Sequence, residues 1–584
     1  MSQSYRERTT GRLTGIVCAV GLISCGSSGK DDDLVEDDGN FAPDHVLQVS
    51  LTLDEEDWES LRRESRTLAA ELSGDCRDAP FSGDYTWFSA NVTIDGESLE
   101  NIGVRKKGFI GSQNIQKPSL KLNLDEYVDG AELFGVDNIV LNNGVQDGAL
   151  IRQCLSYALF DKAGLPAPRC NYARVSVNEE DLGIYVHVEP VKRSFLRAHF
   201  ENDDGDLYEG TVSDFHRLWY ATFEPKTDET DTALGPIIAL MDDLQDGSIP
   251  LESVLEAHIE LDSFLTYLAM ETWTGHWDGY GGNQNNFFIY RDTETDRFTF
   301  IPWGMDGAFD LRVLEDSFVP QGAYIAKAIH ESPELSDRFY DRLGELLDVV
   351  YNEGEILAEI DRMEALLATE IDPSEPSGPR LKTTLAHDIE EVREYVRQRR
   401  DNVRAALPVT PGDFDNPYCM REVGSIEASF ETSWNTEWSD LDDVLSTGDL
   451  DMLVTYEDDE FALSNSGAVI GPPRDEGGEV MEAFEDDYAQ LMMLGEFDAG
   501  GMPAYLLPYL SFPVESILEG ERIGVGWHAE GGLLYAGSDT DYEFVEAGGL
   551  WEGTLGFDEF DLTPGGVIRG SMYSGIYIWE EVTE

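Results

Sequence analysis

Between residues 45 and 53, valine and leucine recur at nearly every second position, which predicts a β-strand with a buried face. Asp54 follows at once, and Asp is a common N-cap for the short helix predicted after it. A second alternating run at 87–94 ends in Asp95-Gly96, a pair of residues that favours the turn of a hairpin. The folded part of the chain is therefore expected to begin as an α+β structure.

Strand-like and helix-like patterns alternate from the Asp95-Gly96 turn to residue 406. Apolar residues spaced three or four apart predict helices, and short β-branched or aromatic runs beside turn residues predict hairpins. Gly164 provides a normal C-terminal stop for the first long helix. The predicted elements are strands within 102–124, a helix over 149–163, a hairpin over 172–188, helices over 191–200 and 251–273, a hairpin over 287–302, and helices over 326–406.

The pattern changes after Pro408. Short alternating runs between residues 426 and 579 are separated by Gly and Asp turns, as in small all-β domains. We therefore expect an α+β domain over residues 45–408, followed by a small all-β domain, either sandwich-like or a barrel, over residues 420–584.

The N-terminus carries a targeting signal. Three arginines precede an apolar run at 16–23, which is too short for a membrane span but suits the core of a signal peptide. The run ends in Leu22-Ile23-Ser24-Cys25-Gly26, which resembles a bacterial lipobox. Residues 1–24 are therefore predicted to be removed and Cys25 to carry the lipid, the alternative being an ordinary signal peptide with a free Cys25. Residues 25–44 are acidic and are expected to form a flexible tether.

These features predict the bacterial cell envelope as the location. Beyond the leader, no segment offers the roughly 20 apolar residues of a membrane helix, so attachment would be through the lipid on Cys25 alone. Asp31 lies well past the position after Cys25 where an inner-membrane retention signal would sit, which slightly favours the outer membrane.

The charge of the chain restricts its partners. Of 584 residues, 116 are acidic and 40 are Lys or Arg, which gives a formal net charge of −76. Such a surface repels phosphate backbones and argues against nucleic-acid binding. The acidity fits either a surface adapted to salt or divalent cations, or an acidic patch that binds basic partners, and composition does not separate the two.

Beyond Cys18 and Cys25, four cysteines remain, and an even number in an exported chain indicates disulfides. Three pairings are possible, and free buried thiols are the alternative. We favour Cys154 with Cys170, because one lies on a predicted helix and the other on the strand that returns after it. The four residues are Cys76, Cys154, Cys170 and Cys419.

The stretch with the most chemical content is 276–287, His-Trp-Asp-Gly-Tyr-Gly-Gly-Asn-Gln-Asn-Asn-Phe, followed by a hairpin and Trp303-Gly304-Met305-Asp306-Gly307. Protein kinases place a catalytic-loop Asp five residues before a metal-binding Asn, then a hairpin, then a metal-binding Asp. In phosphoryl transfer the first carboxylate orients the attacking hydroxyl, while the amide and the second carboxylate hold Mg²⁺ against the phosphates. The residues found in that order are Asp278, Asn283 or Asn286, and Asp306.

Residues 45–407 resemble the CotH (spore coat protein H) family, a divergent protein-kinase-like fold. Each short match is ordinary by itself, but the matches keep the family's order over roughly 360 residues. They are Gly103-Val104-Arg105-Lys106-Lys107-Gly108, Lys117-Pro118-Ser119-Leu120-Lys121-Leu122, Leu141-Asn142-Asn143 with Asp147 and Arg152, Ala163-Gly164-Leu165-Pro166-Ala167-Pro168, Gly183-Ile184-Tyr185 with Glu189, Asp206-Leu207-Tyr208, Asn285-Asn286-Phe287 and Ile301-Pro302-Trp303.

The resemblance implies an ATP-dependent atypical kinase that uses Mg²⁺ or Mn²⁺ and phosphorylates Ser or Thr of exported or envelope proteins. Asp278 would be its catalytic residue. Lys121, or as the alternative Lys117, would contact the ATP phosphates as a point charge, with Glu189 to orient it. Arg105 would also face phosphate.

One departure bears on activity. The family usually reads Trp-Asp-x-Asp where this chain has Trp303-Gly304-Met305-Asp306. Loss of a carboxylate at Gly304 would weaken a metal site that depends on it, whereas Asp306 is retained. The alternative to a kinase is therefore a catalytically inactive structural or adhesive envelope protein with the same fold.

Other common chemistries lack their motifs in this chain. The nine histidines include no His-Glu-x-x-His pair. A Gly-x-Ser-x-Gly nucleophile elbow and a Walker Gly-x-x-x-x-Gly-Lys loop are also missing.

Overall fold

The computed structural model describes residues 41–581 except 75, 82–84, 110–111, 228–232, 316–318, 372–377, 408–417, 437–439, 458, 474–487, 515–521, 527–528 and 538–542. The predicted signal peptide, the lipidation site Cys25 and the tether up to residue 40 lie outside the described residues. Among the described residues, no helix is both long and apolar enough to cross a membrane.

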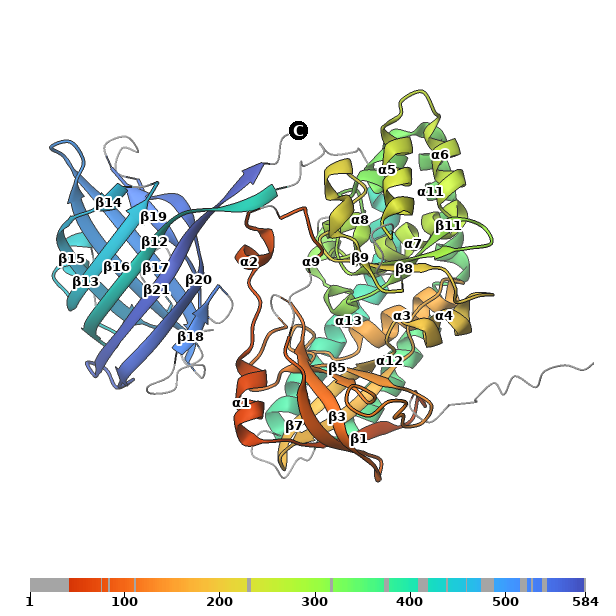
Figure 1. Cartoon of the computed structure of the whole chain (residues 1–584), viewed down its shortest axis with the longest axis horizontal. Coiled ribbons are helices and arrows are strands. Elements are labelled where there is room, and N and C mark those ends of the chain that lie inside the picture. Colours follow the sequence, from red (N-terminus) through yellow and green to blue (C-terminus); the bar gives the residue numbers. More distant parts are fainter. Residues whose placement is uncertain are drawn as a thin grey trace, which may run out of the picture.

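The first part of the chain forms a closed β-barrel, which we call the barrel lobe (residues 46–188; Figure 1). It closes because β6 pairs in parallel with β1, while its other neighbouring strands are antiparallel. Apolar side chains such as Leu51, Ile102 and Leu122 are fully buried in its core. Its strands in spatial order are β1 (Val46–Thr52), β2 (Phe88–Ile94), β3 (Glu97–Lys107), β4 (Ser119–Asn123), β5 (Asn138–Asn142), β7 (Glu180–Val188) and β6 (Cys170–Val177).

Three helices accompany these strands: α1 (Glu55–Arg63), α2 (Leu68–Leu72) and α3 (Arg152–Lys162). Asp54 caps α1 as predicted, since its side chain accepts a hydrogen bond from the Glu56 N–H at 2.9 Å. α3 begins three residues later than the predicted helix over 149–163, after a turn in which Asp147 accepts hydrogen bonds from the Ala149 and Arg152 N–H groups.

The helical lobe (residues 193–406) packs its helices around a small sheet of order β11-β10-β8-β9. The predicted helix over 251–273 is in fact two helices, because Glu260 leaves the helix and its N–H donates to the Phe298 carbonyl at 3.0 Å. The elements are β8 (Asp206–Gly210), β9 (Glu224–Pro225), β10 (Phe287–Asp292), β11 (Arg297–Pro302), η1 (Arg217–Thr222), η2 (Met305–Gly307), α4 (Arg193–His199), α5 (Gly235–Gln245), α6 (Leu251–His258), α7 (Leu261–Thr274), α8 (Tyr280–Asn283), α9 (Arg312–Glu315), α10 (Tyr324–Glu331), α11 (Pro333–Val349), α12 (Glu353–Thr369) and α13 (Gly378–Ala406).

The C-terminal sheet (residues 418–581) confirms the predicted all-β region. Its strands form one antiparallel sheet that curls until its two sides meet, so the shape approaches a barrel (Figure 1). The sides are joined where Thr432 Oγ1 donates to the Ala468 carbonyl at 2.7 Å. The elements are β12 (Tyr418–Ser433), α14 (Leu441–Leu445), β13 (Asp449–Tyr456), β14 (Asp459–Phe461), β15 (Leu463–Gly471), β16 (Tyr488–Asp498), β17 (Pro503–Pro513), β18 (Arg522–Val525), β19 (Glu530–Ala536), β20 (Val545–Phe560) and β21 (Val567–Glu581).

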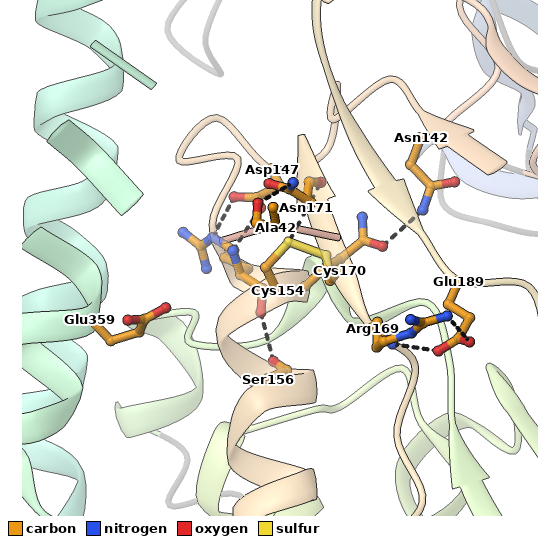
Figure 2. The surroundings of a disulfide bond; sticks show 12 residues. Ala42, Asn142, Asp147, Cys154, Ser156, Arg169, Cys170, Asn171, Glu189 and Glu359 are labelled. Carbon is orange, nitrogen blue, oxygen red and sulfur yellow. Dashed lines mark hydrogen bonds and ion pairs between the residues drawn. A yellow bond between two sulfur atoms is a disulfide. The ribbon is translucent and has the colours of Figure 1, made fainter. Parts of the chain in front are cut away.

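Two disulfides cross-link the described part of the chain. Cys154 is bonded to Cys170, which confirms the favoured pairing and ties α3 to β6 (Figure 2). Cys76 is bonded to Cys419 and so links the barrel lobe to the first residues of β12. Disulfides persist in oxidising compartments, so both bonds indicate an exported protein.

The second disulfide belongs to a packed contact between the C-terminal sheet and α2. Figure 1 shows α2 beside the ends of β12 and β21, which extend beyond the rest of the sheet. Ala69 and Leu72 of α2 are buried against Met420 and Tyr577 in one apolar cluster. The C-terminal sheet is therefore held next to the barrel lobe by a covalent bond and by apolar burial.

Candidate active site

Two adjoining cavities lie between the barrel lobe and the helical lobe. We call the first the basic cavity, about 780 Å³, and the second the loop cavity, about 730 Å³. They share the wall residues Arg66, Lys107, Gly108, Glu209, Thr211 and Trp303, so they form one continuous cleft.

Cations gather in the basic cavity. Arg105 and Lys121 lie opposite each other on β3 and β4, and Lys192 and Lys226 line the same space. Burial lowers the pKa of Lys121 to about 8, and the nearby charge of Arg105 adds to the shift. An anion bound here would relieve both the desolvation and the mutual repulsion of these cations. Lys121 and Arg105 are therefore placed where phosphate groups could bind.

An apolar wall completes the basic cavity. Val140 of β5, Leu207 of β8 and Phe288 of β10 line it together with Val191 in the connection between the two lobes. A cavity with an apolar wall on one side and clustered cations on the other suits a ligand that has a flat base and several phosphates.

Lys107 stands where the two cavities meet, and the sequence analysis did not single it out. Its Nζ donates to Asn142 Oδ1, and Asn142 Nδ2 in turn donates to Gln153 Oε1 of α3 at 2.8 Å. Burial lowers the pKa of Lys107 to about 8, against the opposing effect of the Asp306 carboxylate. The lysine is thus held by neutral amides beside Asp306.

Asp278 is held by the asparagines that follow it in the loop. Its Oδ1 accepts from Asn283 Nδ2 at 2.7 Å, and its Oδ2 accepts from Asn286 Nδ2 at 2.7 Å. Asn285 Nδ2 also approaches Oδ1, at 3.3 Å. Burial raises the pKa of Asp278, and these three amides oppose the rise. The predicted catalytic Asp and both predicted metal-binding Asn residues therefore lie together in one network.

A buried carboxyl group holds the backbone of the loop that carries Asp278. Glu271 of α7 is fully buried, and its Oε2 accepts from the Gly281 N–H at 3.0 Å. A Cβ on Gly279 would lie 2.2 Å from Glu271 Oε1, so the loop approaches the carboxyl this closely only because residue 279 is a glycine. Burial raises the pKa of Glu271 to about 8.

Asp306 lies on η2, directly after the hairpin of β10 and β11, and lines the loop cavity. Burial raises its pKa to about 6, and the charge of Asp278 adds to the rise. The negative charge of Asp278 therefore acts on Asp306 across the cavity that both residues line. The three predicted residues Asp278, Asn286 and Asp306 thus border the same space.

Gly304 has a left-handed backbone conformation with φ of +52°. A Cβ at this position would lie 2.2 Å from Asn286 Oδ1. The side chain of Asn286 therefore occupies the space beside residue 304. A side chain at residue 304 would therefore collide with the amide group of Asn286.

Lys117 and Glu189 lie away from this cleft. Lys117 Nζ donates to the Ile184 carbonyl at 2.7 Å and lies 5.0 Å from the ring centre of Tyr185. Glu189 Oε1 accepts from the Arg169 guanidinium at 2.8 Å, next to the Cys154–Cys170 disulfide (Figure 2). Glu189 is thus paired with Arg169 and does not orient Lys121.

Signals for the residues missed by the sequence analysis were present but weak. Lys107 is two positions from Arg105, so both side chains leave the same face of β3. Glu209 of β8 sits at the junction of the cavities, where Lys226 Nζ contacts its Oε2 at 2.6 Å. Burial alone would raise the pKa of Glu209, and Lys226, Lys121 and Lys107 together lower it. Nothing local in the sequence connects Glu209 with these lysines.

Comparison with known proteins relates this cleft to a family. A family model described as CotH kinase protein matches residues 100–403, which contain every cleft residue discussed above except Arg66. Inner spore coat protein H of Bacillus subtilis (strain 168) is 28% identical over 254 residues, covering 39% of this chain and 68% of that protein. Invasin CotH3 of Rhizopus delemar is 24% identical over 250 residues, covering 40% of each. This chain therefore spans well under two thirds of the Rhizopus protein.

Two solved structures also align with part of the chain. A Helicobacter pylori proinflammatory kinase, CtkA, aligns with 51% of this chain and 95% of its own at 13% identity and a TM-score of 0.23. The toxin–antitoxin complex of HipA and HipB from Shewanella oneidensis aligns at 13% identity and a TM-score of 0.24, covering 51% of this chain and 67% of the other.

Proposed function

This chain belongs to the CotH kinase protein family, and from that membership we propose that it transfers the γ-phosphate of ATP to Ser or Thr of exported or envelope proteins. The observation that carries the proposal is the single cleft that joins a cluster of cations to Asp278, Asn286 and Asp306. Eight basic side chains line the basic cavity against five carboxylates, in a chain with a net charge of −76, and a polyphosphate ligand would account for this local excess of cations.

ATP would lie with its base against the apolar wall and its phosphates toward the loop cavity. Lys121 and Arg105 would contact the phosphates nearest the basic cavity, and Lys107 would reach the phosphate next to Asp306. A lysine serves as a point charge, so its position matters more than the orientation of its side chain. Lys117, the alternative to Lys121, lines neither cavity, and its Nζ donates to the Ile184 carbonyl instead.

The residues present fit a divalent cation. Mg²⁺ in nucleotide sites is usually held by one or two carboxylates together with phosphate oxygens and water. Among the described residues no three His, Cys, Asp or Glu side chains gather as a metal site, so phosphate oxygens would have to complete the shell. Asp306 and the amide oxygen of Asn286 or Asn283 would hold Mg²⁺ or Mn²⁺, which would neutralise charge on the transferred phosphate.

Asp278 would orient the acceptor hydroxyl and take up its proton. Its two carboxylate oxygens are held by amide donors, so the carboxylate keeps one orientation in the cleft. Glu271 holds the backbone of the same loop by accepting a hydrogen bond from the Gly281 N–H. The transfer would therefore depend on a pre-arranged carboxylate and on positioned cations, which are the main contributions proteins make to phosphoryl transfer.

The test is transfer of radiolabelled phosphate from ATP, with Mg²⁺ or Mn²⁺, to a mixture of envelope proteins. Wild type should label acceptors, and Asp306→Ala and Asp278→Asn should each lower the rate at least a hundredfold. Asp310→Ala is the matched control, because Asp310 pairs with Arg312 and does not line either cavity. Equal incorporation by wild type and Asp306→Ala would reject the proposal.

Membrane attachment is a separate part of the proposal. Cys25 would carry a lipid that holds the chain on the bacterial envelope, with the outer membrane favoured. The experiment is fractionation of cells that express wild type or Cys25→Ser. Wild type should sediment with membranes, whereas the variant should appear in the soluble exported fraction.

A second candidate is a structural or adhesive envelope protein without transfer activity. It is supported by Gly304, where the family resemblance leads us to expect a carboxylate, and by the name of the Rhizopus relative, an invasin. Thermal unfolding with and without ATP and Mn²⁺ separates the two, because a ligand that binds only the folded state must raise its stability. No increase with nucleotide would favour this second candidate.

A further inference from the structure

We propose that the C-terminal sheet completes the acceptor side of the cleft, and that Trp579 binds an apolar side chain of a basic polypeptide acceptor close to its Ser or Thr. The inference rests on the proposed function for the identity of the reaction. It goes beyond that function because it assigns a role to the C-terminal sheet and a chemical class to the acceptor.

Trp579 is brought to the cleft by the fold. It lies near the end of β21 and lines the loop cavity that also contains Asp278 and Asp306. Its side chain is 54% exposed, so the indole ring is accessible to a bound partner. A residue some 300 positions from Asp278 in sequence thus shares one cavity with it.

Strand pairing and a disulfide fix the position of Trp579. β12 and β21 pair along their whole length, with Met420 opposite Trp579. Cys419, next to Met420, is bonded to Cys76, and Leu72, which packs in one apolar cluster with Met420, lines the same cavity. The end of β21 is therefore anchored to the wall of the cleft.

In this proposal each cavity binds a different substrate. The basic cavity has the clustered cations that suit nucleotide phosphates, and the loop cavity remains for the acceptor, whose hydroxyl must reach Asp278. Exposed aromatic rings border this second cavity, since Trp277 is 42% exposed and Trp579 is 54% exposed. Exposed tryptophans at the rim of a pocket are typical anchors for apolar side chains of a bound partner.

The charge of the loop cavity favours a basic acceptor. Glu209, Asp214, Asp278 and Asp306 line it, against the basic side chains of Arg66 and Lys107, and Glu209 is paired with Lys226 at 2.6 Å. Arg66 is already paired with Glu71 at 3.0 Å. With a net charge of −76 over the whole chain, the protein attracts cationic segments and repels acidic ones. An apolar residue next to basic residues therefore fits the site better than an acidic segment or a nucleic acid.

The experiment uses the full chain and an array of arginine-containing serine peptides in which each position is scanned with Leu, Trp and Ala. The array is read once for peptide binding and once for transfer of labelled phosphate. Wild type should prefer Leu or Trp over Ala at one position by at least fivefold. Trp579→Ala should remove this preference, and Trp579→Phe should keep most of it.

Tyr573→Ala is the matched control, because Tyr573 lies on the same strand with 47% exposure but does not line the cleft. It should bind and phosphorylate like wild type. Near-UV circular dichroism of both variants excludes misfolding. The KM for ATP should be unchanged in Trp579→Ala, whereas the KM for the preferred peptide should rise at least fivefold.

The outcomes separate this inference from the proposed function. If Trp579→Ala keeps the apolar preference in the binding readout, the role of Trp579 is wrong whether or not transfer occurs. If wild type phosphorylates only a glycan and binds no peptide, the polypeptide acceptor is wrong and the kinase proposal stands. If peptides bind in a Trp579-dependent way but wild type and Asp306→Ala transfer equally little, the docking surface stands and the kinase proposal fails.

Discussion

The side chain of Asn286 fills the space beside the α-carbon of Gly304, since a Cβ on Gly304 would lie 2.2 Å from Asn286 Oδ1. Asn286 in turn donates to the carboxylate of Asp278 at 2.7 Å. Gly304 is thus linked, through the side chain of Asn286, to the proposed catalytic residue. Its effect on activity should therefore appear through the position of Asn286.

Gly304→Ala should lower phosphate transfer at least tenfold and destabilise the fold by about 1–3 kcal/mol. The added methyl group would push Asn286 away from Asp278, and alanine is strained at a φ of +52°. Initial rates and denaturant unfolding check the two effects. Gly183→Ala is the control, because Gly183 also has a positive φ, of +80°, but its Cβ would meet nothing within 4 Å. A Gly304→Ala enzyme with full activity would contradict the link.

Lys107→Met and Lys121→Met should each weaken ATP binding by about 10- to 100-fold, the range expected for loss of a charged hydrogen bond. Both lysines line the cleft, and burial lowers the pKa of each to about 8. Lys117→Met is the matched control, because burial lowers its pKa to about 8 as well, although it lies outside the cleft. Isothermal titration with ATP and Mn²⁺ provides the measurement. Equal affinities of all three variants would disprove the assignment.

Glu271→Gln should stabilise the protein increasingly as pH rises from about 5 to 8. The pKa of Glu271 in the folded state is raised to about 8, above its ordinary value of 4.5, so the folded state binds this proton more tightly than the unfolded state. In the wild type, the contribution of the protonated group is present below pH 4.5 and is lost as pH rises through 8. Glutamine imitates the protonated form and carries no such loss.

The measurement for Glu271 is the free energy of unfolding of both proteins at several pH values. The difference should grow to a few kcal/mol near pH 8 and then level off. Glu256→Gln, at a position whose side chain is 58% exposed, controls for the substitution itself. A constant difference across the pH range would show that Glu271 keeps its ordinary ionisation.

Removal of the Cys154–Cys170 disulfide by a double alanine substitution should lower stability by about 2–4 kcal/mol, as expected for a loop of this size. It should also weaken ATP binding severalfold. Cys154 follows Gln153, which holds Asn142 and through it Lys107. The Cys76/Cys419 double variant is the comparison. It should leave the affinity for ATP unchanged, because that bond lies on the acceptor side of the cleft.

Much of the architecture could be predicted from the sequence. Alternation of apolar residues determined strands such as β1, and the Asp54 cap determined the start of α1, because both depend on near neighbours. The pairing of Cys154 with Cys170 was accessible for the same reason, since only the remainder of α3 and a short connection separate them. The order of Asp278, the asparagines and Asp306 was likewise readable along the chain.

Only the tertiary structure decided which side chains face the cleft. Three lysines lie close together along the chain, at positions 107, 117 and 121. Closure of the barrel directs Lys107 and Lys121 to the cavities and Lys117 to the ring of Tyr185. Glu189 was expected beside a lysine and is bound to Arg169 instead. Local patterns encode which residues are buried, whereas the partner of a buried charge depends on segments that meet only when the chain packs. The same holds for Trp579, which reaches the cleft through strand pairing and the Cys76–Cys419 bond.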